Sequence, residues 1–428
     1  MTSNWFSNKG SLATFLFLPL IRIKNLNSVF FILLKSMNKY IPFLKKSFPV
    51  ALGGLLLTAS IGLMSNTGIA DDKNAPKEIT QANLKLDTVA SGLKMPWATA
   101  FLPNGDLLVT ERGGKLRLVK NGVLDPKEIS GVPQVWYKGQ GGLLDVQLHP
   151  DYAKNGWIYI SYSSPKAEGE EGEEGGANTA LIRAKLKDHA LVDVQKIFKA
   201  IPNVKGNVHF GGRIVFDKKG YVFLSLGERG QKEKSQDLSK DQGKVVRLHE
   251  DGKIPTDNPF VKTANARPEI WSYGHRNPQG MVIHPTTGAI WEHEHGPQGG
   301  DELNIVEKGK NYGWPLITFG IDYDNSIISE DTARAGLEQP VIYWKPSIAP
   351  CGMTFVNSPK FKEWNGDLIV GSLKFMQLQH LVVKGNKVTK KEILFEGIGR
   401  VRDVRQGPDG NIYVVLESSG TVVRISRK

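Results

Sequence analysis

Residues 407–414 read Gly-Pro-Asp-Gly-Asn-Ile-Tyr-Val, a polar turn followed at once by a run of strand-forming residues. Proline, aspartate, asparagine and glycine favour the turn, and the β-branched and aromatic residues after it favour a strand. Similar phrases occur five more times, at 102–109, 149–160, 216–223, 284–291 and 363–370. Successive turn glycines lie 44 to 78 residues apart, which is room for four short strands and their loops. We therefore expect an all-β protein, a six-bladed β-propeller.

The alternative fold is a pair of β-sandwiches, because short strands with turn signals are typical of both architectures. After residue 80 no stretch keeps a helical apolar period for more than about three turns, so a helical domain is not expected. In a propeller, the loops at one end of the blades converge over the central channel, where ligands bind. Site residues should therefore come from loops that are far apart in the sequence.

The first 70 residues differ from the rest of the chain, because they contain seven basic residues and no acidic residue. After Met37 comes a basic region, then an almost wholly apolar run over 50–64, then the small residues that end at Ala70. This order is typical of a secretory signal peptide, and the apolar run is short for a membrane span. We expect cleavage after Ala70 and a periplasmic or secreted protein, with an N-terminal membrane anchor as the alternative.

Three segments follow from this interpretation. A signal peptide over 37–70 precedes a catalytic propeller over 71–428, and 1–36 is an upstream extension if translation starts at Met37. No cysteine lies near the expected cleavage site, which excludes a lipid anchor there. No membrane span is expected once the signal is removed.

The whole chain has 55 lysines and arginines and 43 aspartates and glutamates. Seven of the basic residues lie in the first 70 residues, so the mature chain carries little excess charge. A nucleic-acid surface is therefore not indicated. The single cysteine, Cys351, cannot form an internal disulfide, and we assign it no chemistry. An acidic, glycine-rich run over 166–177 is expected to be a solvated loop between two blades rather than a calcium site.

Candidate catalytic residues lie in glycine-rich segments. Gln140 lies in Gly-Gln-Gly-Gly-Leu-Leu, His209 precedes the third turn phrase, and Glu228 lies in Leu-Gly-Glu-Arg-Gly after that phrase. A histidine paired with a carboxylate can act as a general base, because the carboxylate fixes the tautomer and raises the basicity of the ring. A purely structural loop histidine is the alternative for His209 taken alone.

Lys374, Arg400 and Arg402 form a second group of candidates. Two arginines at i and i+2 on a strand share a face, and with a lysine they would make a pocket for a small, multiply charged anion. Surface salt bridges are the alternative, which the spacing allows equally well.

Oxygen ligands for a cation gather between residues 296 and 312, as carboxylates and as backbone carbonyls of the kind that calcium prefers. The candidates are Gly296, Pro297, Asp301, Glu302 and Tyr312. The nearby His293, Glu294 and His295 could instead suggest zinc. Alternate residues of a strand face opposite sides, however, so the two histidines would share a face without Glu294, and a zinc site is not expected there.

Six motifs carry a resemblance through their order along the chain. They are Gly-Gln-Gly-Gly-Leu-Leu at 139–144, His-x-x-Gly-Arg at 209–213, Gly-Glu-Arg-Gly at 227–230, Tyr-Gly-His-Arg-Asn-Pro-Gln-Gly at 273–280, Glu-His-Gly-Pro at 294–297 and Arg-x-Arg-Asp at 400–403. Together they resemble the soluble, PQQ-dependent aldose sugar dehydrogenases, relatives of soluble quinoprotein glucose dehydrogenase. The resemblance runs from about Leu86 to Ile425, nearly the whole mature chain.

The resemblance implies a six-bladed propeller that binds pyrroloquinoline quinone (PQQ) over the axial channel, together with calcium. It implies oxidation of aldoses at C1 to lactones. His209 would be the base that takes the proton of the anomeric hydroxyl, and Glu228 would orient it. Arg276, the third catalytic residue, and Asn277 would bind the quinone oxygens, where negative charge develops. Electrons would pass to an external acceptor, which would be a quinone, a cytochrome or a dye.

The same resemblance implies the remaining ligands. The cofactor-binding residues would be Gln140, His209, Arg276, Asn277, His295, Lys374, Arg400 and Arg402. Gly296 and Pro297 would present carbonyls to the calcium of the cofactor, while Asp301, Glu302 and Tyr312 would hold a second, structural calcium.

Two differences place the chain nearer the broad-specificity aldose branch, since the glucose dehydrogenases have Gln where His295 stands and Asp where Glu228 stands. Two other functions stay open for a propeller of this kind. A calcium-dependent lactonase or other hydrolase would need a carboxylate-rich axis around a catalytic metal. A non-catalytic binding propeller would bind no quinone.

Overall fold

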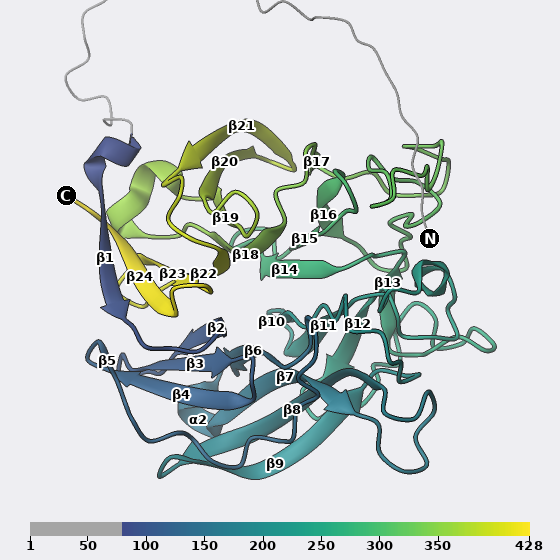
Figure 1. The fold of residues 1–428 in the computed structure, drawn as a ribbon, viewed down its shortest axis with the longest axis horizontal. Coiled ribbons are helices and arrows are strands. Elements are labelled where there is room, and N and C mark those ends of the chain that lie inside the picture. Colours follow the sequence, from purple (N-terminus) through teal and green to yellow (C-terminus); the bar gives the residue numbers. More distant parts are fainter. Residues whose placement is uncertain (1–78) are drawn as a thin grey trace, which may run out of the picture. The chain divides into compact units, whose positions relative to one another are not determined.

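The computed structural model describes residues 79–428, which form six four-stranded sheets around a central axis (Figure 1). The signal segment expected over 37–70 and the extension over 1–36 lie outside the described residues. The first strand of each sheet contacts the first strand of the next, from β2 (Pro96–Phe101) through β22 (Val401–Gln406) and back to β2, and this ring lies nearest the centre (Figure 1). The expected six-bladed β-propeller is confirmed, and paired β-sandwiches are excluded.

Each of the first five blades is one antiparallel sheet whose strands follow the order of the chain. The strands of the first three blades are β2 (Pro96–Phe101), β3 (Leu107–Glu111), β4 (Lys115–Lys120), β5 (Val123–Leu124), β6 (Leu143–Leu148), β7 (Trp157–Pro165), β8 (Ala177–Lys187), β9 (Ala190–Lys199), β10 (Ile214–Phe216), β11 (Tyr221–Leu226), β12 (Lys244–His249) and β13 (Ile270–Tyr273). Those of the fourth and fifth are β14 (Pro278–Ile283), β15 (Ile290–Glu294), β16 (Asp301–Val306), β17 (Ile342–Trp344), β18 (Pro350–Phe355), β19 (Leu368–Ser372), β20 (Leu378–Lys384) and β21 (Lys387–Leu394).

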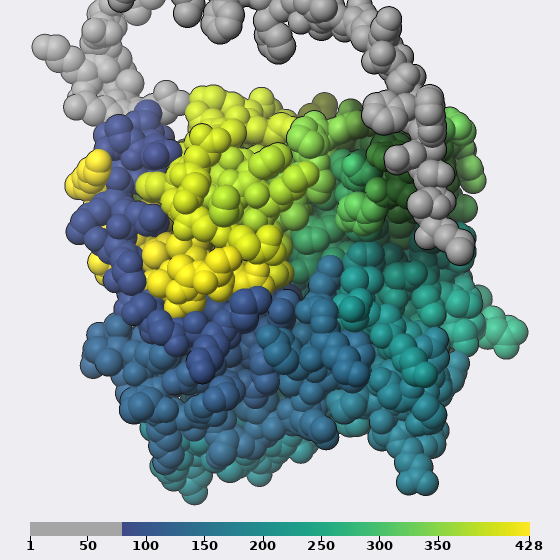
Figure 2. Space-filling view, viewed as in Figure 1, coloured from purple at the N-terminus to yellow at the C-terminus, as the bar shows by residue number. Residues whose placement is uncertain are grey.

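The sixth blade joins the two ends of the described chain. Its strands, in hydrogen-bonded order, are β1 (Leu84–Ala90), β24 (Thr421–Arg427), β23 (Ile412–Leu416) and β22. Leu84 lies opposite Arg427, and Thr88 lies opposite Val423. Figure 2 shows the purple N-terminal strand directly beside the yellow C-terminal segment. This pairing closes the ring, because without β1 the last blade would expose an unpaired edge.

Helical segments are few and short within the described residues. They are η2 (Gln81–Asn83), α2 (Tyr152–Asn155), η3 (Lys232–Ser235) and η4 (Pro359–Trp364). None of these helices is long and apolar enough to cross a membrane.

Each turn phrase of the sequence connects the first and second strands of one blade. The phrase at 407–414 joins β22 to β23, and its Gly410 has a φ of 76°, a left-handed conformation that glycine adopts without steric cost. These six hairpins lie at one end of the first strands. The loops that lead into the first strands therefore gather at the opposite end of the propeller.

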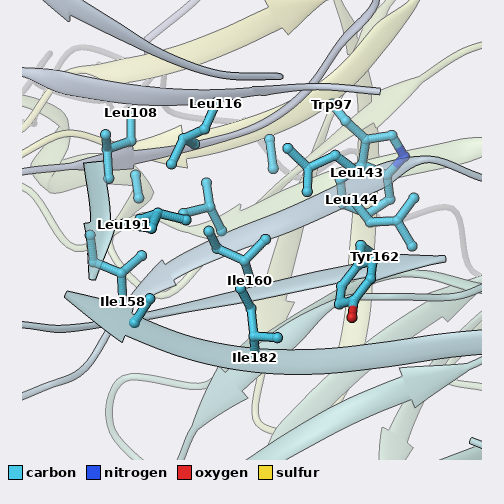
Figure 3. Close-up of a cluster of buried hydrophobic side chains, with 14 of the residues drawn as sticks. Trp97, Leu108, Leu116, Leu143, Leu144, Ile158, Ile160, Tyr162, Ile182 and Leu191 are labelled. Atoms are coloured by element: carbon cyan, nitrogen blue, oxygen red, sulfur yellow. The ribbon is translucent and has the colours of Figure 1, made fainter. Parts of the chain in front are cut away.

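The hydrophobic core consists of layers between adjacent blades. Figure 3 shows the layer between the first two blades, where Leu108 and Leu116 meet Leu143, Ile158 and Ile160. Each sheet is covered on both faces, so inner strands are buried along their length rather than on alternate residues. All five residues of β3 are buried, for example.

A buried ionic network fills the axis. Arg213 Nη1 lies 2.8 Å from Asp403 Oδ1, and Arg405 Nη2 lies 2.6 Å from Asp145 Oδ1. Arg405 Nε also lies 3.0 Å from Asp403 Oδ2. Two arginines thus balance two aspartates, which offsets the cost of removing these charges from water.

The acidic run over 166–177 lies inside the second blade, between β7 and β8, so its expected position between two blades was wrong. Glu170 forms an ion pair with Lys199, and the Glu173 N–H donates to the Asn203 carbonyl at 2.9 Å. The hairpin is therefore attached to the segment that leads to His209.

Candidate active site

The site residues expected from the sequence lie in loops at one end of the propeller. These loops lead into first strands or connect second strands to third strands, and antiparallel pairing brings both kinds to the same end of a blade. The positions are Gln140 before β6, His209 before β10, Glu228 after β11, Arg276 and Asn277 between β13 and β14, His295 after β15, Lys374 after β19 and Arg400 before β22.

His209 and Glu228 form a direct hydrogen-bonded pair. His209 Nδ1 lies 2.7 Å from Glu228 Oε1, and the two side chains are 12% and 2% exposed. An ionised carboxylate only accepts hydrogen bonds, so Nδ1 carries the proton in this pair. The lone pair of His209 Nε2 is thereby left as the basic site of the ring.

The backbone of His209 is held in an unusual conformation. Its φ of 54° lies in the left-handed region, which costs a non-glycine residue on the order of 1–3 kcal/mol. Gln140 Oε1 accepts the His209 N–H at 2.8 Å. Gly227 packs so closely that a Cβ on it would lie 2.1 Å from the His209 carbonyl oxygen. Gln140 and Gly227 thus fix where the imidazole lies.

Burial lowers the pKa of His209 below its usual value of 6.5. The hydrogen bond that His209 donates to Glu228 opposes this shift, and the positive charge of Arg276 adds to it. The ring is therefore neutral at neutral pH, which is the form that a general base requires.

Arg276 lies beside this pair, and the N–H of Glu228 donates to its carbonyl at 2.9 Å. The Arg276 N–H donates to Glu294 Oε2 at 2.5 Å, and Nη1 donates to the carbonyls of His295 and Gly296 at 3.0 and 2.8 Å. Arg276 Nε is buried and has no hydrogen-bond partner within the described part of the chain. A buried donor of this kind suits an oxygen atom of a bound ligand.

Asn277 and His295 continue the same wall. Asn277 Oδ1 accepts the Gly211 N–H at 3.3 Å, and the Asn277 carbonyl accepts the His295 N–H at 3.1 Å. His295 Nε2 donates to the Pro350 carbonyl at 2.8 Å. Burial lowers the pKa of His295 well below its usual range, so this ring is also neutral.

A cavity of about 360 Å³ opens over the axis. Its polar lining includes Arg112, Gln140, Gln279, His295, Arg400, Arg402 and Glu417. The Glu417 carboxylate lies 3.0 Å from Arg400 Nε and 2.8 Å from Arg402 Nη2. Three arginines line the cavity with one carboxylate, which leaves an excess of positive charge that suits an anionic ligand.

Lys374 does not line this cavity. It is exposed and lines a neighbouring groove together with Pro297 and Tyr323. Ala349 lines both spaces, so the groove adjoins the cavity. The structure thus brings the two predicted arginines together and leaves the predicted lysine at the rim.

Sequence reasoning missed Arg112, Tyr323 and Glu417. Tyr323 is 66% exposed, and its ring centre lies 6.0 Å from Arg276 Cζ, over the arginine. Glu417 directly follows β23, the second strand of its blade, as Glu228 follows β11 in the third blade. A carboxylate recurring at the end of second strands is the signal that could have found it.

The Asp301 carboxylate is engaged with protein donors. It accepts the N–H groups of Gly296, Ile348 and Ala349 at 2.7–2.8 Å and the Ser347 hydroxyl at 2.6 Å. Asp301 therefore organises the loop that presents the Gly296 carbonyl.

Glu302 and Tyr312 line a small buried space with Glu294. Burial raises the pKa of Glu302 well above its usual range, and the Glu294 carboxylate adds to the shift. The Tyr312 hydroxyl is occupied, because it accepts the Glu307 N–H at 2.9 Å and donates to the Ile305 carbonyl at 2.5 Å. An ionised Glu302 would need a positive partner, which a bound cation could supply.

The fold and this face define a propeller that combines a neutral histidine, a carboxylate hydrogen-bonded to it and a positively charged axial cavity. The chain belongs to the Glucose / Sorbosone dehydrogenase family, whose model matches residues 93–424. The resemblance carried by the six motifs is confirmed by this match.

Individual relatives agree with this assignment. The chain is 49% identical over 352 residues to the aldose sugar dehydrogenase YliI of Escherichia coli (strain K12), covering 81% of this chain and 93% of the relative. The crystal structure of the soluble aldose sugar dehydrogenase from Escherichia coli in the apo form is 46% identical with a TM-score of 0.75, covering 81% of this chain and 100% of that one. The PQQ-bound aldose sugar dehydrogenase from Streptomyces coelicolor is 27% identical with a TM-score of 0.67, covering 81% and 99%. These relatives indicate a sugar oxidoreductase.

Proposed function

We propose that this protein is a PQQ-dependent, calcium-assisted dehydrogenase that oxidises aldose sugars at C1 to lactones. The observation that carries the proposal is the His209–Glu228 pair, with its 2.7 Å hydrogen bond, on the face that holds a positively charged cavity. The PQQ-bound structure of the Streptomyces coelicolor relative supports the choice of cofactor.

The cavity fits PQQ, which is a flat tricarboxylate that carries a quinone. The Nε atoms of Arg112 and Arg402 are buried without hydrogen-bond partners among residues 79–428, so both guanidinium groups have donors left for carboxylate oxygens. The residues that would hold the cofactor are Gln140, His209, Arg276, Asn277, His295, Arg400 and Arg402, and Lys374 would reach it from the adjoining groove.

PQQ, when bound, would accept the hydride that leaves C1 of the sugar. The protein itself carries out the proton transfer, in which His209 Nε2 takes the proton of the anomeric hydroxyl. Glu228, hydrogen-bonded to Nδ1, stabilises the imidazolium that results. The Arg276 guanidinium would stabilise the negative charge that develops on the quinone oxygens. Loss of one proton and one hydride from the C1–OH group leaves the lactone carbonyl.

Calcium enters the proposal at two places. The carbonyls of Gly296 and Pro297 would bind the calcium that accompanies the cofactor, and the Glu302 carboxylate with the Tyr312 carbonyl would bind a second, structural ion. The raised pKa of Glu302 supports the second site. Asp301 would act by organising the loop that presents the Gly296 carbonyl, because its own oxygen atoms already accept protein donors.

The electrons would leave through an external acceptor, a quinone, a cytochrome or a dye. The signal segment expected over 37–70 would deliver the protein to the periplasm or the exterior. A hydrolase is less well supported, because Arg112, Arg400 and Arg402 line the cavity where that mechanism needs carboxylates for a metal.

Reconstitution tests the proposal directly. The purified protein is titrated with PQQ in the presence of calcium, and glucose-driven reduction of a dye is followed with and without the cofactor. Cofactor-dependent reduction is expected. Failure of both quinone binding and dye reduction would contradict the proposal, and lactone hydrolysis by the same sample would favour the hydrolase.

A further inference from the structure

His275, Glu292 and Glu294 form a buried cluster behind the active-site loops. Their side chains are 0%, 0% and 4–5% exposed, and their ligand atoms all lie within 4.8 Å of one another. Glu292 and Glu294 share one face of β15 with Ile290, which packs against Val245 of the third blade. The cluster therefore lies at the junction of the third and fourth blades.

The imidazole of His275 is fixed with one nitrogen toward the carboxylates. Its Nε2 lies 2.8 Å from Ser272 Oγ, and its ring stacks on the Tyr312 ring with centres 4.6 Å apart. Nδ1 has no hydrogen-bond partner in the described structure. It lies 3.9 Å from Glu292 Oε2 and 3.7 Å from Glu294 Oε1, too far for hydrogen bonds.

The Glu292 carboxylate is also short of partners. Glu292 Oε1 is buried without a hydrogen-bond partner among residues 79–428, and Oε2 has only a long contact of 3.5 Å from Asn304 Nδ2. Burial and the Glu294 charge raise the pKa of Glu292 well above its usual range. Glu302, paired with Glu294 across the sheet, adds a third, half-buried carboxylate. Buried carboxylates at this density require protons or a cation.

The geometry points to a divalent transition-metal ion of the zinc class bound by His275 Nδ1, Glu292 and Glu294. Donors held about 2.0–2.2 Å from one ion at tetrahedral to trigonal angles lie about 3.3–3.8 Å apart, close to the separations seen here. An imidazole ligand favours such a metal over calcium, which prefers oxygen. Ser272 has the role of the outer partner that orients a metal-bound histidine.

This site differs from two others nearby. It uses the face of β15 opposite His293, so it is not a site formed by His293 and His295. It adjoins the calcium proposed at Glu302 and Tyr312, because Glu294 lines the same small space, but that calcium has only oxygen ligands. Glu294 connects the metal to the active site, because its Oε2 accepts the Arg276 N–H. The metal would therefore position the Arg276 loop without touching the substrate.

Metal binding can be measured without PQQ or turnover. The full chain is stripped with a chelator, incubated with zinc and with calcium, passed through gel filtration and analysed for metal content. About one zinc per chain is expected for the wild type. Glu292→Gln keeps the shape of the side chain and should bind zinc at least about tenfold more weakly. Glu302→Gln is the matched control, which should keep zinc and lose calcium.

X-ray absorption of the zinc-loaded wild type gives a second readout that does not depend on any variant folding. One imidazole nitrogen with oxygen ligands at about 2.0–2.2 Å is expected. The inference is overturned if the wild type retains no zinc, if Glu292→Gln retains as much as the wild type, or if the spectrum shows two imidazoles or none. Uptake of calcium alone would also overturn it.

Discussion

Two buried histidines of this propeller face glutamates at different distances. His209 Nδ1 lies 2.7 Å from Glu228, whereas His275 Nδ1 lies 3.7 and 3.9 Å from Glu294 and Glu292. The short separation is a hydrogen bond that fixes a tautomer and stabilises a charged ring. The longer ones exceed a hydrogen bond and leave room for an ion. The same residue types thus suit proton transfer in one place and metal binding in the other, and the separation decides between them.

The largest effect is expected at the His209–Glu228 pair, the first of the two pairs compared. His209→Ala should lower kcat by about 10²–10⁴-fold, because the proposed base for the sugar proton is removed. The affinity for PQQ should change little, since the arginines of the cavity remain. Steady-state kinetics and a PQQ titration measure both quantities. His284→Ala, in a turn phrase at the opposite end of the propeller, is the matched control, and normal turnover of His209→Ala would remove His209 as the base.

Glu228→Gln should lower kcat by about 10²-fold while the protein stays folded. The hydrogen bond that His209 donates to Glu228 raises the pKa of His209, so its loss should move the acidic limb of the pH–rate profile to lower pH. A pH profile of kcat/KM for both proteins measures this shift. A lowered rate with an unmoved limb would show that Glu228 does not act through His209.

The affinity for the cofactor should depend on Arg402. Arg402→Ala should weaken PQQ binding by about 10–100-fold, because a charge-assisted hydrogen bond to a carboxylate contributes about 1.5–3 kcal/mol. Arg402→Lys keeps the charge but loses the planar fork, so an intermediate affinity is expected. Titration of PQQ against each variant measures this. Equal affinity in all three proteins would mean that the cavity is not the carboxylate pocket.

Removal of the metal tests the second pair compared, the proposed metal site at His275. Stripping the His275 site should lower Tm by about 5 °C, because an ion bound at a hundred times its Kd contributes about 2.7 kcal/mol. Scanning calorimetry of stripped, calcium-loaded and zinc-loaded samples measures the change. Zinc should raise the Tm of the stripped protein further than calcium does. Glu292→Gln should not show this additional rise. Full restoration by calcium alone would count against the His275 site.

The smallest effect expected is the pH dependence of the unmodified enzyme. Burial holds the pKa of His209 below 6.5, so kcat/KM should stay level as pH falls to 6.5 and decline only as pH passes below that folded-state pKa. The unfolded chain binds this proton at a higher pH than the folded chain. His209 therefore lowers the free energy of unfolding as pH falls below 6.5. A decline in rate that is centred above pH 6.5 would contradict the burial of the ring.

The fold could be predicted almost completely because its signals are local. Turn residues followed by strand residues at 407–414 and five similar places mark the hairpin between the first and second strands of every blade. The pairing of β1 with β24 could not be read in this way. It joins residues more than 330 positions apart, and no turn connects them.

The candidate site shows the same division. Glycine-rich motifs indicated Gln140 and His209, whose loops need special backbone conformations that leave a mark in the sequence. Tyr323 left no such mark, because its importance comes only from its contact with Arg276, and Glu417 is marked only by its place at the end of a second strand.

The sequence by itself determined which residue types this protein has at the ends of its strands, and hence a propeller with histidines, carboxylates and arginines on one face. Only the tertiary structure decided how far apart they lie. Glu228 and Glu292 are both glutamates near a histidine, yet one lies within hydrogen-bond distance and the other does not. That difference of about 1 Å is set by the packing of adjacent blades and by the loops between them, which no local sequence pattern encodes.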